Sequence, residues 1–345
     1  MKKILLAVLL CLSLFGLAAC SGSGSVSGDG EKETATKDSE KVVMKLGSVN
    51  NDKHTLHEGY QKFKEIVEKE TNGEVEVEIY MNGLLGNDQT MIEALQLGTI
   101  EAVGASTSML ANWAPSMMAF DLPFVINDES EADKLLDGPF GEKAAKQLEA
   151  EQLLLVGYME NGFRHLTNSK HEVKTLQDIE GFKIRTMQTP LNLATWEALG
   201  TNPTPMPYTE LFTAMEQKVI DAQENPYGNM ALDKFYEVQK YLTKTGHVYN
   251  PMGLVISKKF YDQLSPEQQT VVKKAGEEAS TYQRELNRER SEEYLKTLED
   301  EGMVITDLSP EARKEFEEKV QGVNEDFAEK IGTEYYDEFM AEVSK

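Results

Sequence analysis

The chain has 345 residues, about two domains at roughly 150 residues each, so it is long enough to bury a sizeable core. Hydrophobic residues make up 40% and charged residues 27%, an ordinary globular composition that excludes wholesale disorder and a polytopic membrane protein. Aspartate and glutamate total 59 against 35 lysines and arginines, and the formal net charge of −24 would repel phosphate backbones, so we expect no nucleic-acid partner.

The first residues have the pattern of a secretory signal. Lys2 and Lys3 precede an apolar run over residues 4–17, which is short for a transmembrane helix but has the length of a signal-peptide apolar region. We therefore expect residues 1–19 to be a signal peptide, and we exclude them from the fold.

The two cysteines refine this expectation. They are Cys11 and Cys20, so the rest of the protein can form no internal disulfide. Residues 17–20 read Leu-Ala-Ala-Cys, which resembles the bacterial lipobox. In that case cleavage leaves Cys20 for acylation, and residues 20–40 form a lipidated Ser/Gly-rich tether. The alternative is an ordinary cleavage site followed by an incidental cysteine.

Strand-like and helix-like stretches alternate in the first part of the body. An apolar strand at 42–46 precedes apolar residues at helical spacing over 56–67, and a strand with one polar face follows at 75–79. A helix at 87–98, with an asparagine cap and a terminal glycine, leads to a short strand at 102–105. This succession predicts an α/β domain with a largely parallel sheet, whose ligand crevice opens at the carboxyl ends of the strands.

A second unit of the same kind begins near Gly162. Its markers are an apolar run at 153–156, a strand at 183–185, a helix at 189–200, a helix at 209–218 and a strand at 219–223. Three prolines within residues 201–207 exclude a helix there. We expect a smaller α/β domain inserted between two parts of the first.

The longest predicted helix begins at Ser265. Residues 265–268 form a capping box with proline at the first helical position, and the helix has no strong stop signal before Gly302. About 37 residues at 1.5 Å each would span roughly 55 Å, so we expect this helix to bridge both domains. Its predicted apolar stripe consists of Val271, Ala275, Ala279, Tyr282 and Leu286. The polar stretch at 287–293 fits either a solvated surface or a bridge over an interdomain cleft.

Catalytic and metal-binding motifs are sparse. The sequence has no Gly-x-x-x-x-Gly-Lys phosphate loop and no Gly-x-Ser-x-Gly nucleophile elbow. His54 and His57 could share a metal, but Gln61 stands where His-Glu-x-x-His would place its second histidine, and a solvated pair at a helix N-terminus explains them as well. We expect no enzyme activity, no cofactor and no metal.

Two arginines stand in apolar surroundings at predicted strand ends. Arg164 follows Gly162-Phe163, and Arg185 follows Phe182-Lys183-Ile184. Guanidinium forks suit bidentate recognition of a carboxylate. A structural ion pair is equally compatible with either position.

Several long strings of residues carry a family resemblance. They are Gly181-Phe182-Lys183-Ile184-Arg185, Pro190, Ala198 to Pro207, Asp221 to Pro226 and Lys234 to Val238, with supporting pieces at Tyr80 to Asn87, Met91 to Gly98, Asp121 to Val125 and Asn161 to Arg164. In this order, and over nearly all of residues 43–310, they resemble the DctP-type solute-binding proteins of tripartite ATP-independent periplasmic (TRAP) transporters.

The resemblance implies an α/β fold like that of periplasmic binding proteins, with two α/β domains around a ligand cleft and a long helix spanning both. We place domain I at 41–161 plus 251–289, and domain II at 162–250 plus 290–345.

The resemblance also implies roles for single residues. Arg185, at the arginine of the family's Lys-Ile-Arg motif, is expected to clamp the ligand carboxylate, and Arg164 and Asn225 match two further family ligand contacts. These roles agree with the physical need, because a carboxylate buried in a dry cleft requires a charge-assisted bidentate partner and an amide.

The chain departs from the family's sialic-acid binders. Thr55 and Ser106 stand where those proteins have an asparagine and a glutamate, which disfavours sialic acid and leaves sugar acids such as uronates, or C4-dicarboxylates. Ser106, His54 and Trp196 are further candidates for contact with a hydroxylated ligand, although Trp196 equally fits the core.

The function implied by the resemblance is that of an extracytoplasmic solute-binding lipoprotein, expected to be a monomer. It would capture a small organic acid and deliver it to TRAP transporter membrane subunits. The alternatives are a sensory ligand-binding protein that works with a membrane receptor, and an extracytoplasmic enzyme on the same fold, because a fold alone does not fix function.

Overall fold

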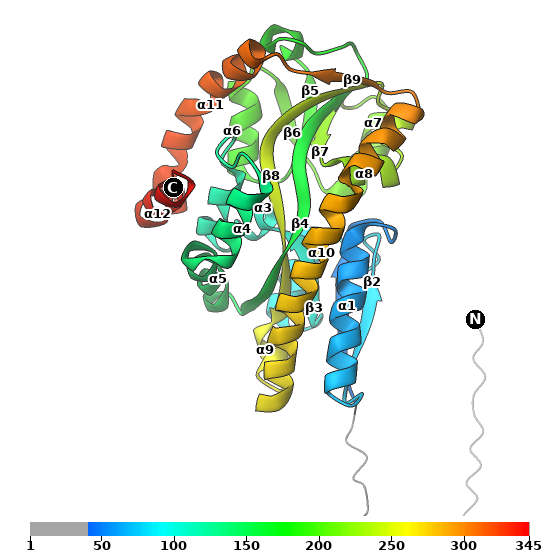
Figure 1. Cartoon of the computed structure of the whole chain (residues 1–345), viewed down its shortest axis with the longest axis vertical. Coiled ribbons are helices and arrows are strands. Elements are labelled where there is room, and N and C mark those ends of the chain that lie inside the picture. Colours follow the sequence, from blue (N-terminus) through cyan, green and yellow to red (C-terminus); the bar gives the residue numbers. More distant parts are fainter. Residues whose placement is uncertain (1–40, 345) are drawn as a thin grey trace, which may run out of the picture. The chain divides into compact units, whose positions relative to one another are not determined.

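The computed structural model describes residues 41–344 (Figure 1). The predicted signal peptide at 1–19, the acylation site Cys20 and the tether at 20–40 lie outside the described residues. No helix within residues 41–344 is both long and apolar enough to cross a membrane.

Nine strands in the described part of the chain form one mixed sheet. Its order is β2-β1-β3-β8-β4-β7-β5-β6, with β9 beside β8. The strands are β1 Val42–Ser48, β2 Val75–Tyr80, β3 Ala102–Ser106, β4 Leu153–Asn168, β5 Lys183–Thr186, β6 Asn202–Pro205, β7 Ala222–Asn225, β8 Tyr241–Ser257 and β9 Val304–Asp307. In one half of the sheet β1 runs parallel to β2 and β3, and in the other half β5 runs parallel to β6 and β7. Each half therefore contains the parallel strands that the sequence predicts.

The two longest strands, β4 and β8, join the halves. They have 16 and 17 residues, pair antiparallel and run through both parts of the sheet (Figure 1). Three register shifts interrupt their pairing, and the middle one lies between Glu160 and Gly162. Bulges of this kind bend a strand pair, so the bend falls where the two predicted domains meet.

Helices cover the sheet and connect its strands. They are α1 Thr55–Glu70, α2 Asp88–Leu97, α3 Thr107–Leu110, η1 Pro115–Asp121, α4 Glu129–Asp137, α5 Pro139–Ala150, η2 Leu176–Ile179, α6 Pro190–Ala198, α7 Tyr208–Glu216, α8 Tyr227–Leu232, η3 Phe235–Glu237, α9 Lys258–Tyr261, α10 Pro266–Asp300, α11 Pro310–Ile331 and α12 Thr333–Val343. The predicted helix ends are confirmed: Asn87 Oδ1 accepts a hydrogen bond from Thr90 N at 3.0 Å, Gly98 has φ 76°, and Ser265 forms its capping box with Gln268.

The 35-residue helix α10 packs on α1, β4 and α8 and therefore spans both halves, as predicted. The predicted stripe is wrong in part, because Tyr282 is 39% exposed whereas Gln283, Arg284 and Asn287 are buried. The physical reason is a polar partner: Gln283 Oε1 accepts from Glu160 N at 2.7 Å, and Asn287 Nδ2 donates to Glu160 Oε1 at 3.0 Å.

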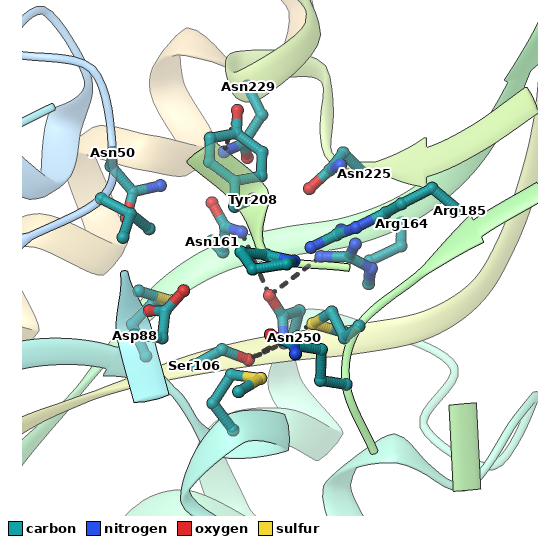
Figure 2. A pocket seen from close by; sticks show the side chains of 16 residues that line it. Asn50, Asp88, Ser106, Asn161, Arg164, Arg185, Tyr208, Asn225, Asn229 and Asn250 are labelled. Carbon is teal, nitrogen blue, oxygen red and sulfur yellow. Dashed lines mark hydrogen bonds between the residues drawn. The ribbon is translucent and has the colours of Figure 1, made fainter. Parts of the chain in front are cut away.

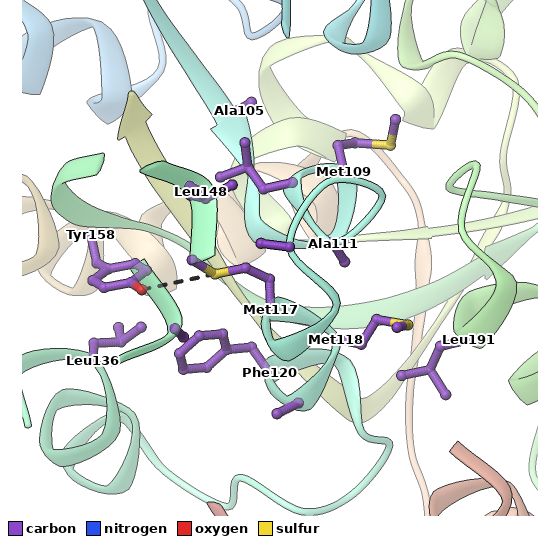
Figure 3. Packing of buried hydrophobic residues seen from close by; sticks show 14 of the residues in the cluster. Ala105, Met109, Ala111, Met117, Met118, Phe120, Leu136, Leu148, Tyr158 and Leu191 are labelled. Carbon is purple, nitrogen blue, oxygen red and sulfur yellow. Dashed lines mark hydrogen bonds between the residues drawn. The ribbon is translucent and has the colours of Figure 1, made fainter. Parts of the chain in front are cut away.

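Separate hydrophobic clusters pack against the two halves. Figure 3 shows part of one of them, in which Met117, Phe120 and Tyr158 lie together. The C-terminal helices join this cluster, since the Phe339 ring of α12 lies 5.0 Å from the Phe140 ring of α5, centroid to centroid. Through α11, which contacts α6 and η1, the end of the chain touches both halves.

Candidate functional site

A cavity lies between the two halves of the described residues (Figure 2). Its volume is about 40 Å³. Its polar lining consists of Asn50, Asp88, Ser106, Asn161, Arg164, Arg185, Gln188, Tyr208, Asn225, Asn229 and Asn250. Val49, Met109, Met187, Pro207 and Met252 complete the wall.

Strand ends position much of this lining. Ser106 ends β3, Asn225 ends β7, and Asn50 lies two residues after β1. The carboxyl ends of parallel strands are where α/β sheets bind ligands, so the cavity lies where the sequence directs attention. Asn161 and Arg164 come instead from the bent region of β4.

Arg164 is held by its own neighbours. Its Nε and Nη2 donate to the carboxylate of Glu224, with Nη2 to Oε1 at 2.9 Å, and Nη2 also donates to the Glu224 backbone oxygen at 2.6 Å. Nη1 donates to Asn250 Oδ1 at 3.2 Å. A guanidinium has five N–H donors, so a single Nη1 N–H is left for a ligand.

The anion of this pair is strongly stabilised. Burial by itself would raise the pKa of Glu224, but the Arg164 charge, together with hydrogen bonds from His247 and Arg164, lowers it to about 2. Glu224 is therefore ionised at neutral pH and balances the charge of Arg164.

Arg185 has the opposite situation. It is 3% exposed, and only its Nε makes a hydrogen bond within the described residues, donating to Met206 O at 3.0 Å. Its two Nη groups have no hydrogen-bond partner among the described residues, and they point into the cavity in Figure 2. Burial and the nearby Arg164 lower the pKa of Arg185 to about 10, so the side chain remains cationic at neutral pH. The site thus presents an open guanidinium fork that suits a carboxylate.

An amide and hydroxyl network forms the cavity wall beside the arginines. Asn250 Nδ2 donates to Ser106 Oγ at 2.8 Å, and Asn161 Nδ2 donates to Asn250 Oδ1 at 3.1 Å. Asn225 Nδ2 donates to Gln223 Oε1 at 2.6 Å, which leaves the Asn225 carbonyl oxygen without a partner among the described residues. Because each amide is fixed by a neighbour, its remaining polar atoms have defined directions.

Asp88 lines the other side of the cavity. It is the first residue of α2 and is 9% exposed; its carboxylate accepts a hydrogen bond from its own backbone N–H but none from another described side chain. Burial raises the pKa of Asp88 to about 6, although the Arg185 charge opposes this rise.

The structure brings together four of the six predicted contact residues, namely Arg185, Arg164, Asn225 and Ser106. His54 and Trp196 do not line this cavity. His54 caps α1, where its Nδ1 accepts from Leu56 N at 3.2 Å, and burial lowers its pKa to about 4.

Trp196 lies in a hydrophobic cluster instead. It is 1% exposed, packs with Ile184 and Phe182, and meets the His247 ring at 5.2 Å between centroids. The face of α6 that carries Trp196 is the face that packs on the sheet, so the core alternative describes its position.

Among the polar lining residues that sequence analysis missed are Asn50, Asp88, Tyr208 and Asn250. Two of them had usable signals, because Asp88 directly follows the Leu85-Gly86-Asn87 string and Tyr208 directly follows Pro207 in the proline-rich string. Asn250 had none, since it lies within a long strand and reaches the cavity only because β8 pairs with β4.

Three comparisons with known proteins agree with this geometry. A family model described as bacterial extracellular solute-binding protein, family 7 (DctP), matches residues 46–330. The 2,3-diketo-L-gulonate-binding periplasmic protein YiaO of Escherichia coli is 35% identical over 301 residues, which are 87% of this chain and 88% of that protein.

Solved structures are similar over almost the same span. The sugar acid binding protein DctPAm of Advenella mimigardefordensis, in complex with galactonate, has a TM-score of 0.87 and 38% identity and covers 89% of this chain and 99% of its own. A TRAP periplasmic solute-binding protein of Polaromonas, bound to D-erythronate, has a TM-score of 0.84 and 33% identity, covering 87% and 99%.

Proposed function

The chain belongs to the DctP family of bacterial extracellular solute-binding proteins, and from this premise we propose that its cavity captures a small organic acid by one carboxylate and releases it unaltered to the membrane subunits of a TRAP transporter. As a member of this family, the protein works outside the cytoplasm.

The observation that carries the proposal is the open fork of Arg185. A buried cation without an anionic partner is costly, and no salt bridge within the described residues joins Arg185 to a carboxylate. A ligand carboxylate would supply the missing charge and accept two parallel hydrogen bonds from the Nη groups. In this proposal the Asn225 amide and the remaining Nη1 N–H of Arg164 add polar contacts.

Several relatives support a sugar-derived acid as the ligand, while others are named for C4-dicarboxylates or are bound to succinate. Galactonate, D-erythronate and 2,3-diketo-L-gulonate, named for three similar proteins, are all carboxylates with several oxygen substituents. The amides around Asn250 and the hydroxyl of Ser106 offer donors and acceptors for such substituents. We therefore propose a sugar acid as the ligand, with C4-dicarboxylates as the competing class.

The proposed mode of capture is closure of two domains, 41–161 plus 251–289 and 162–250 plus 290–345. In support, the middle bulge of β4 sets Glu160 opposite Pro251 and Gly162 opposite Asn250, at the two proposed crossings. Asn51 Nδ2 of the first half also donates to Asp233 Oδ1 of the second at 2.8 Å, a contact that separation of the domains would break.

The remaining proposals concern the setting of the protein. We propose that residues 1–19 are removed, that acylated Cys20 anchors a monomer to the membrane through the tether at 20–40, and that the protein is not an enzyme. Support for the anchor comes from the lipobox-like residues 17–20 alone.

A melting-temperature screen over sugar acids and dicarboxylates tests the proposed function. A true ligand at 100 times its dissociation constant should add about 2.7 kcal/mol to the free energy of unfolding, which shifts the melting temperature measurably. The ligand is then recovered from the denatured protein and compared with the starting acid by mass spectrometry. A chemically altered ligand, or a screen in which no acid stabilises the protein, would contradict the proposal.

A further inference from the structure

We propose that Asp88 makes the cavity selective for hydroxylated monocarboxylates and rejects acids that carry a carboxylate at each end. The inference rests on the proposed function, because it concerns the same cavity, and it chooses between the two ligand classes left open there.

The charges of the lining support this choice. Three lining residues among the described ones are charged, namely Asp88, Arg164 and Arg185. The buried carboxylate of Glu224 balances Arg164. Arg185 and Asp88 are therefore the two charged lining residues without an ion-pair partner in the described part of the chain. One such cation and one such anion fit a ligand with a single negative charge.

Asp88 is directed at the ligand space. Its carboxylate points into the cavity in Figure 2, and Arg185 reaches in from the other side. Asp88 is 9% exposed, and apart from a hydrogen bond from its own backbone N–H it accepts none from a described side chain. A carboxylate with so little exposure and no side-chain donor gains from a further hydrogen bond, and a ligand in the cavity can donate one.

The other nearby aspartates do not line the cavity. Asp233 Oδ1 accepts from Asn51, and its Oδ2 accepts from the Tyr208 hydroxyl. Asp121 Oδ1 accepts from Ser108 Oγ at 2.6 Å, and its Oδ2, which has no partner among the described residues, is buried away from the cavity lining. Asp88 is thus the lining carboxylate that can discriminate between ligands.

The two ligand classes meet Asp88 differently. When a ligand carboxylate occupies the Arg185 fork, a hydroxyl at the far end of the ligand can donate to Asp88. A second carboxylate in that place has no proton to donate at neutral pH and brings like charges together in a site shielded from water. We therefore expect the monocarboxylate of a matched pair to bind at least about 10-fold more tightly.

Two matched pairs of probes isolate this effect. D-Galactonate and galactarate differ only in the last carbon, which is a primary alcohol in the first and a carboxylate in the second. D-Erythronate and meso-tartrate differ in the same way with a shorter chain. Calorimetric titration at pH 7.5 of the wild-type protein, of Asp88→Asn and of the control Asp52→Asn gives the affinity ratio for each pair. Asp52 is exposed and does not line the cavity, so its replacement removes the same charge from elsewhere.

For a pair that binds, we expect the wild type and Asp52→Asn to prefer the monocarboxylate at least about 10-fold, and Asp88→Asn to lose most of that preference because an amide can donate to a carboxylate. A wild type that binds the dicarboxylate as tightly as its partner would overturn the inference even without the variants. An unchanged ratio in a folded Asp88→Asn variant would overturn it as well.

The outcomes separate this inference from the proposed function. Equal binding of both acids that Arg185→Ala abolishes would leave the proposed function intact and remove only the role of Asp88. Absence of binding for every acid, in the pairs and in the wider screen, would overturn the proposed function and this inference with it.

Discussion

Arg164 and Arg185 show how far a residue type determines chemistry. Both follow apolar residues at predicted strand ends, and the sequence left an ion pair and a ligand contact open for each; in the structure Arg164 lies inside β4. In the structure Arg164 is paired with Glu224, which lies sixty positions further along the chain and is carried on β7, whereas Arg185 keeps its two Nη groups unpaired. The decisive difference is a contact between distant strands, which no local pattern contains.

The open fork of Arg185 leads to the first prediction. Arg185→Ala should weaken ligand binding by roughly 2 to 5 kcal/mol, or about 30-fold to several thousand-fold, because the ligand carboxylate loses its partner while it stays buried. Arg185→Lys should rescue little, since an ammonium cannot make the planar bidentate contact.

Calorimetric titration with the best ligand from the screen measures both variants, and circular dichroism checks that they fold. Near-native affinity in folded Arg185→Ala would return this residue to a structural role.

The second prediction concerns the buried cap His54. Its pKa is lowered to about 4 by burial, from a usual 6.5. Below pH 6.5 the unfolded chain takes up a proton that the folded chain does not, so stability falls as the pH drops from about 6.5 towards 4. His54→Asn keeps a good capping side chain but removes this titration, and it should reduce the loss of unfolding free energy between pH 7 and pH 5 by about 2 kcal/mol.

Urea unfolding at the two pH values measures this difference. His57→Asn is the matched control, because His57 lies on the same first turn but is only half-buried. An equal loss of stability in the wild type and His54→Asn would show that His54 does not contribute.

At the scale of elements, strand β4 explains why part of the fold escaped the sequence. Only residues 153–156 have the apolar run that identified a strand, yet β4 continues to Asn168. The missed part contains Glu160, whose side chain contacts Asn287 of α10, and Asn161 and Arg164, whose side chains line the cavity. The strand has no continuous apolar pattern in the part whose residues line the cavity and contact α10.

The polar stretch of α10 at 287–293 was ambiguous in the sequence for the same reason, because its polar residues also serve contacts with other elements. The sequence allowed a solvated surface or a bridge, and the structure shows polar contacts: Arg288 bonds to Asp133 and Glu160, and Arg290 pairs with Glu58 of α1. These partners come from three other elements, so periodicity alone could not reveal that the residues of this stretch form ion pairs. The capping box of Ser265, in contrast, is a local signal and was predicted correctly.

The third prediction tests the close approach of α10 to β4. A Cβ atom added at Gly276 would lie 2.4 Å from the backbone oxygen of Val156, and a backbone atom cannot swing away. Gly276→Ala should therefore lower the free energy of unfolding by about 1 to 3 kcal/mol, despite the better helix propensity of alanine.

Gly322 provides the control within another helix. Nothing lies within 4 Å of its added Cβ, so Gly322→Ala in α11 should stabilise the protein by up to about 1 kcal/mol. Urea unfolding of both variants compares them, and a stabilised Gly276→Ala would contradict the packing described for α10.

At the scale of the whole molecule, the charge of the protein and that of its proposed ligand have the same sign. The chain carries −24, yet exposed charges are screened within about 8 Å at physiological salt. The cavity residues therefore decide affinity, and Arg185 supplies the positive charge that a ligand carboxylate would meet. Composition alone could not indicate that an acidic protein would present a site for an anion.

The family resemblance supplied the two α/β halves and the long helix that spans them, and the structural comparisons confirm this fold. Sequence analysis identified no elements after Gly302, where α11 and α12 form. Their buried residues Phe316, Phe327 and Phe339 are widely spaced among acidic ones, and the surface that they cover belongs to elements far earlier in the chain. Such packing cannot be assigned until the partner surface is known.

The fourth prediction concerns the proposed anchor. Cys20→Ser should abolish acylation and release the protein from the membrane, because the tether at 20–40 has no long apolar run that could hold a bilayer. Membrane fractionation in cells that lack the transporter subunits measures this. Retention of Cys20→Ser in the membrane fraction would contradict the lipobox interpretation.

The central claim is that the cavity binds an organic acid and returns it unchanged. Its most direct test is calorimetric titration of the wild-type protein with the acid that raises its melting temperature most, followed by recovery of that acid after denaturation. The account predicts saturable binding of one acid per chain and quantitative recovery of the starting compound. Absence of saturable binding, or recovery of a converted product, would contradict it.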